Sequence, residues 1–499
     1  MFNFFKRFYL VFFFFVNFQC NTIDNDADPT LTLELTQLNF ESPSNLLYPN
    51  FIGNTYHYGL SFDNDSLLYI NAQSKNNSTE IYINNIFIGY GSINYELELK
   101  NPNDNIIIEL KNKGNSLKSY LHKIYDNYPK VDLVKSSNLV DDGFIILSPR
   151  YQIDNEYKTS LMIIDNNGIL RYKKIIEGNA VDFKRHSNGQ YSYALREGKN
   201  DFNHWTSEII ILNQFFEEEN RLKCINLNHT DPHDFLITEE GNYILLSYHT
   251  NFRDFSEWGY SENEPVRESY IQEISKDGNI IFEWNSWDNI DINGCLNHRF
   301  PDDYSHINSI QVAPDGNLIA SFRGCSSILK INRLSGKTIW SVGGANPSLN
   351  IEGDFYEEFC GQHTASESHD GYIYIFDNGG HCNGEREDKF GSFSRALQYK
   401  LDIENNRLDF IRDYSFKNEY NKYTSSGGSF FTTRNGNWLI NWSRNIHTIT
   451  EVSNENKIEM EFNLLLNNDT LSSYRAYRIY DIELPLLING NLTFEKFSN

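Results

Sequence analysis

The chain has 499 residues, more than one hydrophobic core usually supports, so we expect a large domain and a smaller one. It carries 67 Asp and Glu against 43 Lys and Arg, a formal net charge of −24. This charge repels nucleic acid and anionic membrane surfaces, so no nucleic-acid partner is expected and an anionic substrate needs a local cationic pocket. Aromatic residues make up 15% of the chain, and the prevailing Ile, Tyr, Phe and Asn with glycine turns indicate an all-β protein.

The N-terminus has the pattern of an export signal. A Lys-Arg pair precedes an apolar run, residues 8–16, that is too short to span a bilayer but has the length of a secretory signal core. Cys20 then opens an acidic segment, NTIDNDADP, as in a bacterial lipoprotein whose cysteine becomes the lipidated first residue. Gln19 stands where a small residue is usual, so an ordinary cleaved signal over residues 1–20 is the alternative. Both interpretations predict an exported protein, in the periplasm or on the cell surface and lipid-anchored under the first, with no membrane span in the mature chain.

Five cysteines follow the signal segment: Cys224, Cys295, Cys325, Cys360 and Cys382. An odd number in an oxidising compartment allows at most two disulfides and leaves one thiol. Their spacing matches no zinc site, and it does not determine the pairing.

Residues 21–130 are expected to form a small β-sandwich domain. From about residue 31 to 128 short apolar runs alternate with turns, as in SLLYINAQ, TEIYINNIFIGYG and NIIIELKN. This period of two, without helical periodicity, is typical of an antiparallel sandwich. No concentrated chemistry lies in this part of the chain.

Residues 131–499 are expected to form a six-bladed β-propeller that carries the chemistry. A polar turn leads into a strand nine times, in DNNGILRY, HSNGQYSYAL, TEEGNYILLSY, SKDGNIIFEW, APDGNLIASF, LSGKTIWSV, SHDGYIYIFD, TRNGNWLINW and SNENKIEMEF. These are predicted hairpins in series, and their outer glycines recur at intervals close to one four-stranded blade plus insertions: Gly189, Gly241, Gly316, Gly371 and Gly436. Pairing of the C-terminal YRAYRIYDIEL with the early GFIILSP would close the last blade. A pair of flat sheets is the alternative.

One segment, LSGKT at residues 334–338, could be mistaken for a phosphate-binding loop. Such a loop needs glycine five residues before Gly336, where this chain has Ile331. We therefore predict a turn between strands at LSGKT.

Four stretches place a cationic or nucleophilic side chain beside strand-like sequence. They are His233 in PHDF, His306 in SHINSI, Arg323 in SFRG and His363 in GQHTA, and Asn308 shares a strand face with His306. If they flank the inner strands of a propeller, they converge on its channel. Taken singly, each histidine is more often a packing or turn residue, and the ordinary role of Arg323 would be a surface salt bridge. An inward-pointing arginine, however, would be an uncompensated charge unless it met an anion.

These segments resemble the bacterial arylsulfate sulfotransferase family, the nucleotide-independent sulfotransferases of the periplasm. The resemblance covers most of residues 131–480 and nine segments in the family order: AVDFKRHSNGQ, PHDFLITEEGNY, YIQEISKDGNIIFEWNSWD, HINSIQVAPDGNLIASFR, IWSVGG, QHTA, FDNG, SRALQYKLD and YTSSGGSFF. It implies a six-bladed propeller behind a small β-sandwich, which moves a sulfuryl group from a phenolic sulfate ester to a phenolic acceptor by a ping-pong route. His363 would be the nucleophile that forms a sulfohistidine, and His233, His306 and Arg323 would bind and stabilise the group. No cofactor, metal or nucleotide takes part.

General chemistry fits these roles. Sulfuryl transfer passes through a loose transition state whose charge is spread over the non-bridging oxygens and the departing phenolate, so positioned donors supply most of the rate. The planar fork of Arg323 suits two sulfuryl oxygens, and its charge would hold a neighbouring histidine neutral. Either His233 or His306 could protonate the phenolate and then deprotonate the acceptor. We expect Asn308 to contact the substrate.

Two other functions are open at this point. A non-catalytic surface propeller that binds sulfated or aromatic ligands would use the same side chains without turnover. A metallohydrolase is suggested by a group of potential ligands, although their spacing matches no metal signature: His229, His233, Asp234, His363, His369, Asp370 and His381.

Overall fold

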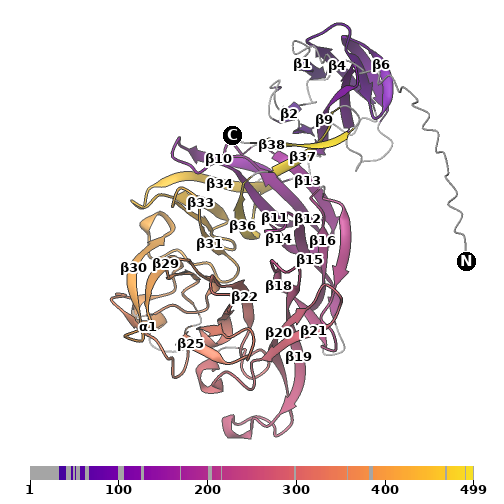
Figure 1. Ribbon diagram of the computed structural model, residues 1–499. Helices are drawn as coiled ribbons and strands as arrows, with labels where there is room; N and C mark the ends of the chain where they lie inside the picture. The colour runs from indigo at the N-terminus through magenta and orange to yellow at the C-terminus, as the bar shows by residue number, and fades with distance from the viewer. Residues whose placement is uncertain are drawn as a thin grey trace, which may run out of the picture.

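The computed structural model describes residues 33–40, 46–48, 51, 57–61, 67–98, 106–124, 129–168, 170–199, 205–214, 216–296, 299–356, 358–380, 382, 386–466, 469–480, 482–488 and 491–497. Strands dominate these ranges (Figure 1), so the predicted all-β class is confirmed. The described helices are short: α1 (Arg386–Phe390), η1 (Ser256–Trp258), η2 (Ile292–Cys295), η3 (Arg323–Cys325) and η4 (Phe416–Asn418). The signal segment and Cys20 lie outside the described residues. In the part of the chain that is described, no helix has the length and apolarity needed to cross a membrane.

The first part of the chain forms two sheets over one hydrophobic core. One sheet has the order β1 (Leu35–Phe40), β4 (Leu67–Ser74) and β7 (Ser92–Glu98). The other has the order β2 (Leu46–Tyr48), β3 (His57–Ser61), β9 (Asn115–Ile124), β8 (Ile106–Asn112), β5 (Glu80–Ile83) and β6 (Ile86–Tyr90). Leu68 and Ile70 from the first sheet and Ile81 and Ile108 from the second are fully or almost fully buried in the shared core. The prediction of a wholly antiparallel arrangement is wrong at one pair, since β3 and β9 run parallel where the chain returns to this sheet after a long excursion. The predicted domain limits at residues 21–130 stay a prediction.

Most of the remaining strands fall into groups of four, which we call units 1 to 6. Unit 1 is β36 (Ser473–Ile479), β11 (Phe144–Ile153), β12 (Glu156–Ile164) and β13 (Leu170–Glu177); unit 2 is β14 (Asn179–Arg185), β15 (Tyr191–Lys199), β16 (Trp205–Leu212) and β17 (Glu218–Leu222); unit 3 is β18 (His229–Ile237), β19 (Tyr243–Arg253), β20 (Glu264–Ile274) and β21 (Ile280–Asn285). Unit 4 is β22 (Ile307–Val312), β23 (Leu318–Phe322), β24 (Ser327–Ile331) and β25 (Thr338–Gly343); unit 5 is β27 (His363–Glu367), β28 (Tyr372–Asp377), β29 (Arg395–Asp402) and β30 (Arg407–Ser415); unit 6 is β31 (Ser429–Thr432), β32 (Trp438–Asn441), β33 (Thr448–Val452) and β34 (Ile458–Leu466). Units 2 and 3 are joined into one sheet by a single pair, Ser207 with Thr230.

Three short strands extend these units at their edges. β10 (Lys130–Ser136) and β35 (Asp469–Leu471) pair with β34, and β26 (Asn350–Glu352) runs parallel to β30. All three lie on the last strand of a unit, away from the first strands.

The nine predicted hairpins are all present, each joining two paired antiparallel strands. The recurring glycines occupy the turn between the first and second strand of units 2 to 6, where φ lies between 69° and 88°. LSGKT is the turn between β24 and β25, as predicted.

The C-terminal segment closes unit 1, as expected from its sequence. β36 pairs antiparallel with β11, with Phe144 opposite Ile479 and Leu147 opposite Ala476. The chain beyond this strand departs from the expectation, because β37 (Ile482–Ile488) and β38 (Asn491–Phe497) pair only with each other in the described structure, and β37 lies against β9.

Apolar clusters lie between consecutive units. Units 1 and 2 share one core, and the same holds for units 2 and 3, 3 and 4, 4 and 5, and 5 and 6. A further cluster joins unit 6 back to unit 1, where Leu147 and Ala476 meet Leu439 and Phe462. The first strands of the units contact one another in the same order. The contacting pairs are β36 with β14, β14 with β18, β18 with β22, β22 with β27, β27 with β31, and β31 with β36.

The described cysteines form two disulfides, Cys295–Cys325 and Cys360–Cys382, and leave Cys224 free. The prediction of at most two bridges and one remaining thiol is therefore confirmed.

Candidate active site

The four residues selected from the sequence meet in one cavity. His233, His306, Arg323 and His363 all line a space of about 310 Å³. The rings of His233 and His306 have centroids 5.1 Å apart. Tyr474, from β36, lies between the histidines, with ring centroids 5.8 Å from His233 and 6.2 Å from His363. Residues from four different parts of the chain thus share one site.

Irregular backbone aims these side chains. The pairing of β18 with β19 shifts register between Thr230 and Phe235, and His233 lies inside that bulge, not just before the strand as expected. His306 has φ +47 directly before β22, and Thr364 has φ +44 directly after His363. A positive φ is costly for any residue with a Cβ, above all for a β-branched one. A bulge turns the side chain of the bulged residue away from the regular alternation along the strand. Such strain concentrates where side chains must be held in unusual directions.

The tautomer of His363 is set by its neighbours. The residue is buried, and its Nδ1 lies 2.7 Å from Oδ1 of Asn378. The Nδ2 of Asn378 donates to the carbonyl oxygens of Thr424 and Gly427, at 2.8 and 3.1 Å, so its Oδ1 faces the histidine as an acceptor. The proton of the neutral ring is therefore on Nδ1, and Nε2 carries a lone pair.

That lone pair points at the backbone of a glycine turn. The N–H of Gly427 donates to Nε2 of His363 at 3.1 Å. Gly427 has φ +69, and a Cβ on it would lie 2.6 Å from Oγ of Ser443, so a glycine is needed here. Burial and the charge of Arg323 hold the pKa of His363 well below its usual value, with the bond to Asn378 opposing them. The ring is neutral, as a nucleophile must be.

The other two histidines each have a carboxylate on Nδ1. His306 Nδ1 lies 2.6 Å from Asp303, and His233 Nδ1 lies 2.7 Å from Asp231. Burial lowers the pKa of His306 to about 4, and the pull of Asp303 offsets this only in part. Burial alone would raise the pKa of the Asp303 carboxyl, but His306 and two arginines hold it well below its usual value. The two dyads share a design, in which the carboxylate fixes the ring and leaves Nε2 for chemistry.

Arg323 is a buried cation that forms no salt bridge with a carboxylate of the described residues. It is 6% exposed, its Nη2 donates to the carbonyl oxygen of Ser425 at 3.2 Å, and its Nε makes no hydrogen bond with any described residue. Burial and the charge of Arg299 lower its pKa. A buried charge of this kind is expensive unless an anion joins it.

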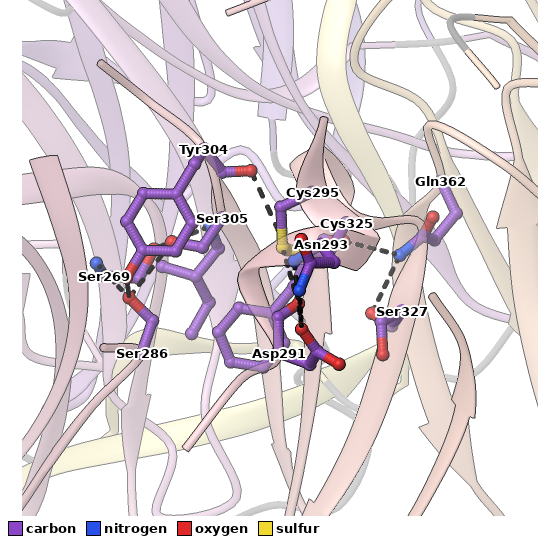
Figure 2. The surroundings of a disulfide bond; sticks show 12 residues. Ser269, Ser286, Asp291, Asn293, Cys295, Tyr304, Ser305, Cys325, Ser327 and Gln362 are labelled. Carbon is purple, nitrogen blue, oxygen red and sulfur yellow. Dashed lines mark hydrogen bonds between the residues drawn. A yellow bond between two sulfur atoms is a disulfide. The ribbon is translucent and has the colours of Figure 1, made fainter. Parts of the chain in front are cut away.

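A disulfide fixes the backbone that carries Arg323. Cys295 of η2 is bonded to Cys325 of η3, whose first residue is Arg323 (Figure 2). Beside this bridge, Nε2 of Gln362 donates to the carbonyl oxygens of Ser327 and Phe322 at 3.0 and 3.3 Å. Gln362 precedes His363 in the chain, so one hydrogen-bond network fixes the positions of both Arg323 and His363.

Asn308 is not part of the cavity lining. It is fully buried, and its Nδ2 donates to the carbonyl oxygen of Gln362 at 2.7 Å. It therefore holds the backbone next to His363, and the structure gives no contact through which it would touch a substrate.

Sequence reasoning missed several groups in the cavity. Asp231 and Asp303 stand two and three residues before their histidines, a spacing that could have signalled the dyads. Tyr474 reaches the site from the far end of the chain and has no local signal. Arginine is the largest omission, since five more line the cavity beside the predicted Arg323: Arg150, Arg196, Arg267, Arg299 and Arg444. The cationic pocket that a chain of charge −24 requires for an anionic substrate is present.

Metal ligation finds no support in the described part of the chain. No group of three or more His, Cys, Asp or Glu side chains there is placed to hold an ion. Asp234 is engaged instead by Lys184 and by Arg475, at 3.0 Å from the latter. His381 lies outside the described residues.

The chain matches a known family. The family model described as Arylsulfotransferase (ASST) matches residues 209–464, slightly more than half of the 499 residues. The matched range contains all four cavity residues predicted from the sequence. No curated protein matches the chain.

Solved structures resemble the chain only distantly. A protein of unknown function from Bacteroides caccae is 11% identical, covers 68% of this chain and 100% of its own, and has a TM-score of 0.42. A catalytically inactive virginiamycin B lyase from Staphylococcus aureus with quinupristin is 10% identical, with 69% and 98% covered and a TM-score of 0.37. A streptogramin B lyase is 12% identical, with 73% and 98% covered and a TM-score of 0.38. All three TM-scores lie below 0.5, so these likenesses say nothing about activity.

Proposed function

Because the chain belongs to the arylsulfotransferase family, we propose that it moves a sulfuryl group from a phenolic sulfate ester to a phenolic acceptor through a sulfohistidine on His363. One observation carries the proposal: a neutral histidine with a fixed lone pair on Nε2 shares a cavity with a buried arginine that no described carboxylate pairs with. The first is a nucleophile, and the second is a receptor for the group that the nucleophile would attack.

We also propose that units 1 to 6 are the blades of a six-bladed β-propeller with the cavity at one end of its channel. Two observations support this. The apolar clusters between units run from unit 1 to unit 6 and back to unit 1, and the first strands contact one another in the same order. Unit 1 also combines β11 with β36 from near the C-terminal end of the units, a pairing that would close such a ring.

In the first half of the reaction, the lone pair of His363 Nε2 forms a bond to sulfur as the bond from sulfur to the aryl oxygen breaks. Arg323 holds sulfuryl oxygens with its free donors. The bond from Gly427 N–H to Nε2 must break first, at a cost of about 1 kcal/mol. The electron pair of the broken bond goes to the phenolate oxygen, which takes a proton.

His233 is the group that supplies this proton. With a pKa of about 4, His306 carries no proton on Nε2 at neutral pH and cannot be the acid. His306 instead accepts a hydrogen bond or helps to place the substrate. In the second half, neutral His233 takes the proton of the acceptor phenol, whose oxygen attacks sulfur, and the electron pair of the nitrogen–sulfur bond returns to His363.

The test is turnover of 4-nitrophenyl sulfate with and without phenol. We expect steady release of nitrophenolate only when phenol is present, and phenyl sulfate as the second product. Without acceptor, release should stop after about one equivalent per site, because a ping-pong enzyme remains loaded. Steady release without any acceptor would instead indicate a hydrolase, and binding without release would indicate a non-catalytic ligand-binding protein.

Replacing the acid should separate good from poor leaving groups. His233→Ala should slow transfer from phenyl sulfate by about 10² to 10⁴-fold and transfer from 4-nitrophenyl sulfate far less, because nitrophenolate leaves without a proton. The measurement is kcat/KM for both donors in the variant and in the unaltered protein. Equal losses for the two donors would remove His233 from the acid role.

We also propose where the protein is located. The signal pattern before residue 20 leads us to propose export, with lipidation of Cys20. The two disulfides support an oxidising compartment, where such bonds persist.

A further inference from the structure

Three arginines form a group of their own at one side of the cavity: Arg150 of β11, Arg196 of β15 and Arg444, which follows β32. With Trp205 they line both the catalytic cavity and a neighbouring, more open space of about 530 Å³. The two spaces therefore adjoin at these four side chains. Arg444 is exposed and Trp205 is 51% exposed, so this side faces solvent.

The positive charge of this group is not balanced by ion pairs. None of the three arginines makes a salt bridge with a described carboxylate. Arg150 donates to Oδ1 of Asn179 at 3.1 Å, and the Nε of Arg196 is buried without a hydrogen bond. Burial lowers the pKa of Arg150, and the positive charges of Arg196 and Arg444 lower it further.

Carboxylates nearby do not relieve this repulsion. Glu156 and Glu177, which line the outer space, are exposed, and Glu177 is paired with Lys158 at 3.1 Å. Asp231 attracts Arg196 but is bonded to His233. In a chain with 24 more negative than positive charges, three unpaired arginines side by side indicate an anion that is bound from outside.

The sulfuryl group cannot be that anion while it reacts, because Arg323 and His363 hold it deeper in the cavity under the proposed function. We propose that Arg150, Arg196 and Arg444 bind a second anionic group, a carboxylate or a sulfate, on the aromatic substrate itself, away from the reacting oxygen. The proposal rests on the proposed function and narrows its substrates to aryl sulfates or phenols that carry a second negative charge. Guanidinium forks bind such groups in pairs of hydrogen bonds, and Trp205 and Tyr157, half exposed beside them, offer apolar faces to a ring.

Binding of unreactive analogues tests this without turnover. Calorimetry would compare 4-sulfobenzoate with 4-sulfobenzamide, which has the same shape and lacks the second charge. The benzoate should bind at least about tenfold more tightly, because hydrogen bonds to a charged group contribute about 1.5–3 kcal/mol. Arg150→Gln and Arg444→Gln should each bring that ratio close to one, and Arg407→Gln, on a half-buried arginine paired with Asp402 and Asp409, should leave it unchanged.

Equal affinities for the two analogues, no measurable binding of either, or a ratio that survives Arg150→Gln and Arg444→Gln together would overturn the proposal. Kinetics then locate the charged substrate. A preference for hydroxyphenylpropanoate over its methyl ester as acceptor places the second charge on the acceptor, and the same preference between their sulfate esters places it on the donor. Transfer from 4-nitrophenyl sulfate to phenol without any charge preference would support the proposed function and refute this inference. Charge-selective binding without transfer would refute the proposed function and support a binding site for a second anionic group.

Discussion

His363→Ala should lower transfer from 4-nitrophenyl sulfate to phenol by about four orders of magnitude or more, because it removes the atom that forms the bond to sulfur. The cavity, Arg323 and both histidine–aspartate dyads would remain, so substrate should still bind. The measurement is kcat together with the affinity for an unreactive aryl sulfonate.

The same variant should lose the covalent adduct. Incubation of the unaltered protein with donor alone should add the mass of one SO₃ group to the peptide that contains His363. Because Asn378 fixes the ring proton on Nδ1, we expect the group on Nε2, which nitrogen-edited NMR of labelled protein distinguishes from Nδ1. An adduct on Nδ1 would show that the tautomer assignment is wrong.

His369 provides a matched control. It lies in the turn between β27 and β28, is exposed and does not line the catalytic cavity. His369→Ala should retain activity and labelling, and both variants should unfold at temperatures close to that of the unaltered protein. Persistent turnover in His363→Ala would refute the assignment of the nucleophile.

The fold was predictable because its signals are local. Each hairpin needs a turn residue with positive φ and a following apolar run, and both are visible in a short window such as APDGNLIASF. Pairing of β36 with β11 was predictable for another reason: in the expected propeller, the last strand would have no other partner. The position of β37 and β38 was not predictable, since their apolar pattern fits a sheet edge in either part of the molecule.

Sequence could predict only those site residues that stand in a recognisable segment of their own. His233, His306, Arg323 and His363 each stand in a segment with a family resemblance, and the structure brings them together. The bulge at His233 and the positive φ of His306 and Thr364 have no signal in the local sequence. The expected substrate contact of Asn308 assumes regular alternation with His306 along one strand. The register of β22 against β23 shifts between Ile307 and Ser309, so that alternation does not hold.

The arginine group shows what a linear pattern hides. Arg150, Arg196 and Arg444 come from units 1, 2 and 6, and in each segment a lone arginine looks like a solvated surface charge. Their mutual repulsion exists only after the units assemble.

Arg323→Met should lower kcat/KM by about 10² to 10³-fold or more and should also stabilise the protein. The first effect follows because a preorganised donor to the transition state contributes about 2.7–4 kcal/mol. The second follows because a buried charge without a close carboxylate costs free energy in the empty site, so an apolar side chain of similar length should raise the free energy of unfolding by about 1 kcal/mol or more. Steady-state kinetics and denaturant unfolding of the unliganded protein measure the two effects.

The pH profile gives a third readout. Arg323 helps to hold the pKa of His363 low, so its removal raises that pKa toward the usual value. A protonated ring cannot attack, and the acidic limb of the rate profile should therefore move to higher pH in Arg323→Met. Arg323→Lys, which keeps the charge and loses the fork, should lose activity with a smaller shift of that limb.

Arg395 is the matched control for the stability effect. It is also a buried arginine, but it lies 2.8 Å from Asp354, 3.0 Å from Asp377 and 3.2 Å from Asp413. Arg395→Met should destabilise the protein by about 3–5 kcal/mol, because it leaves those carboxylates uncompensated. If Arg323→Met destabilised the protein in the same way, Arg323 would be a structural ion-pair residue like Arg395, and the anion-receptor role on which the sulfuryl site depends would fail.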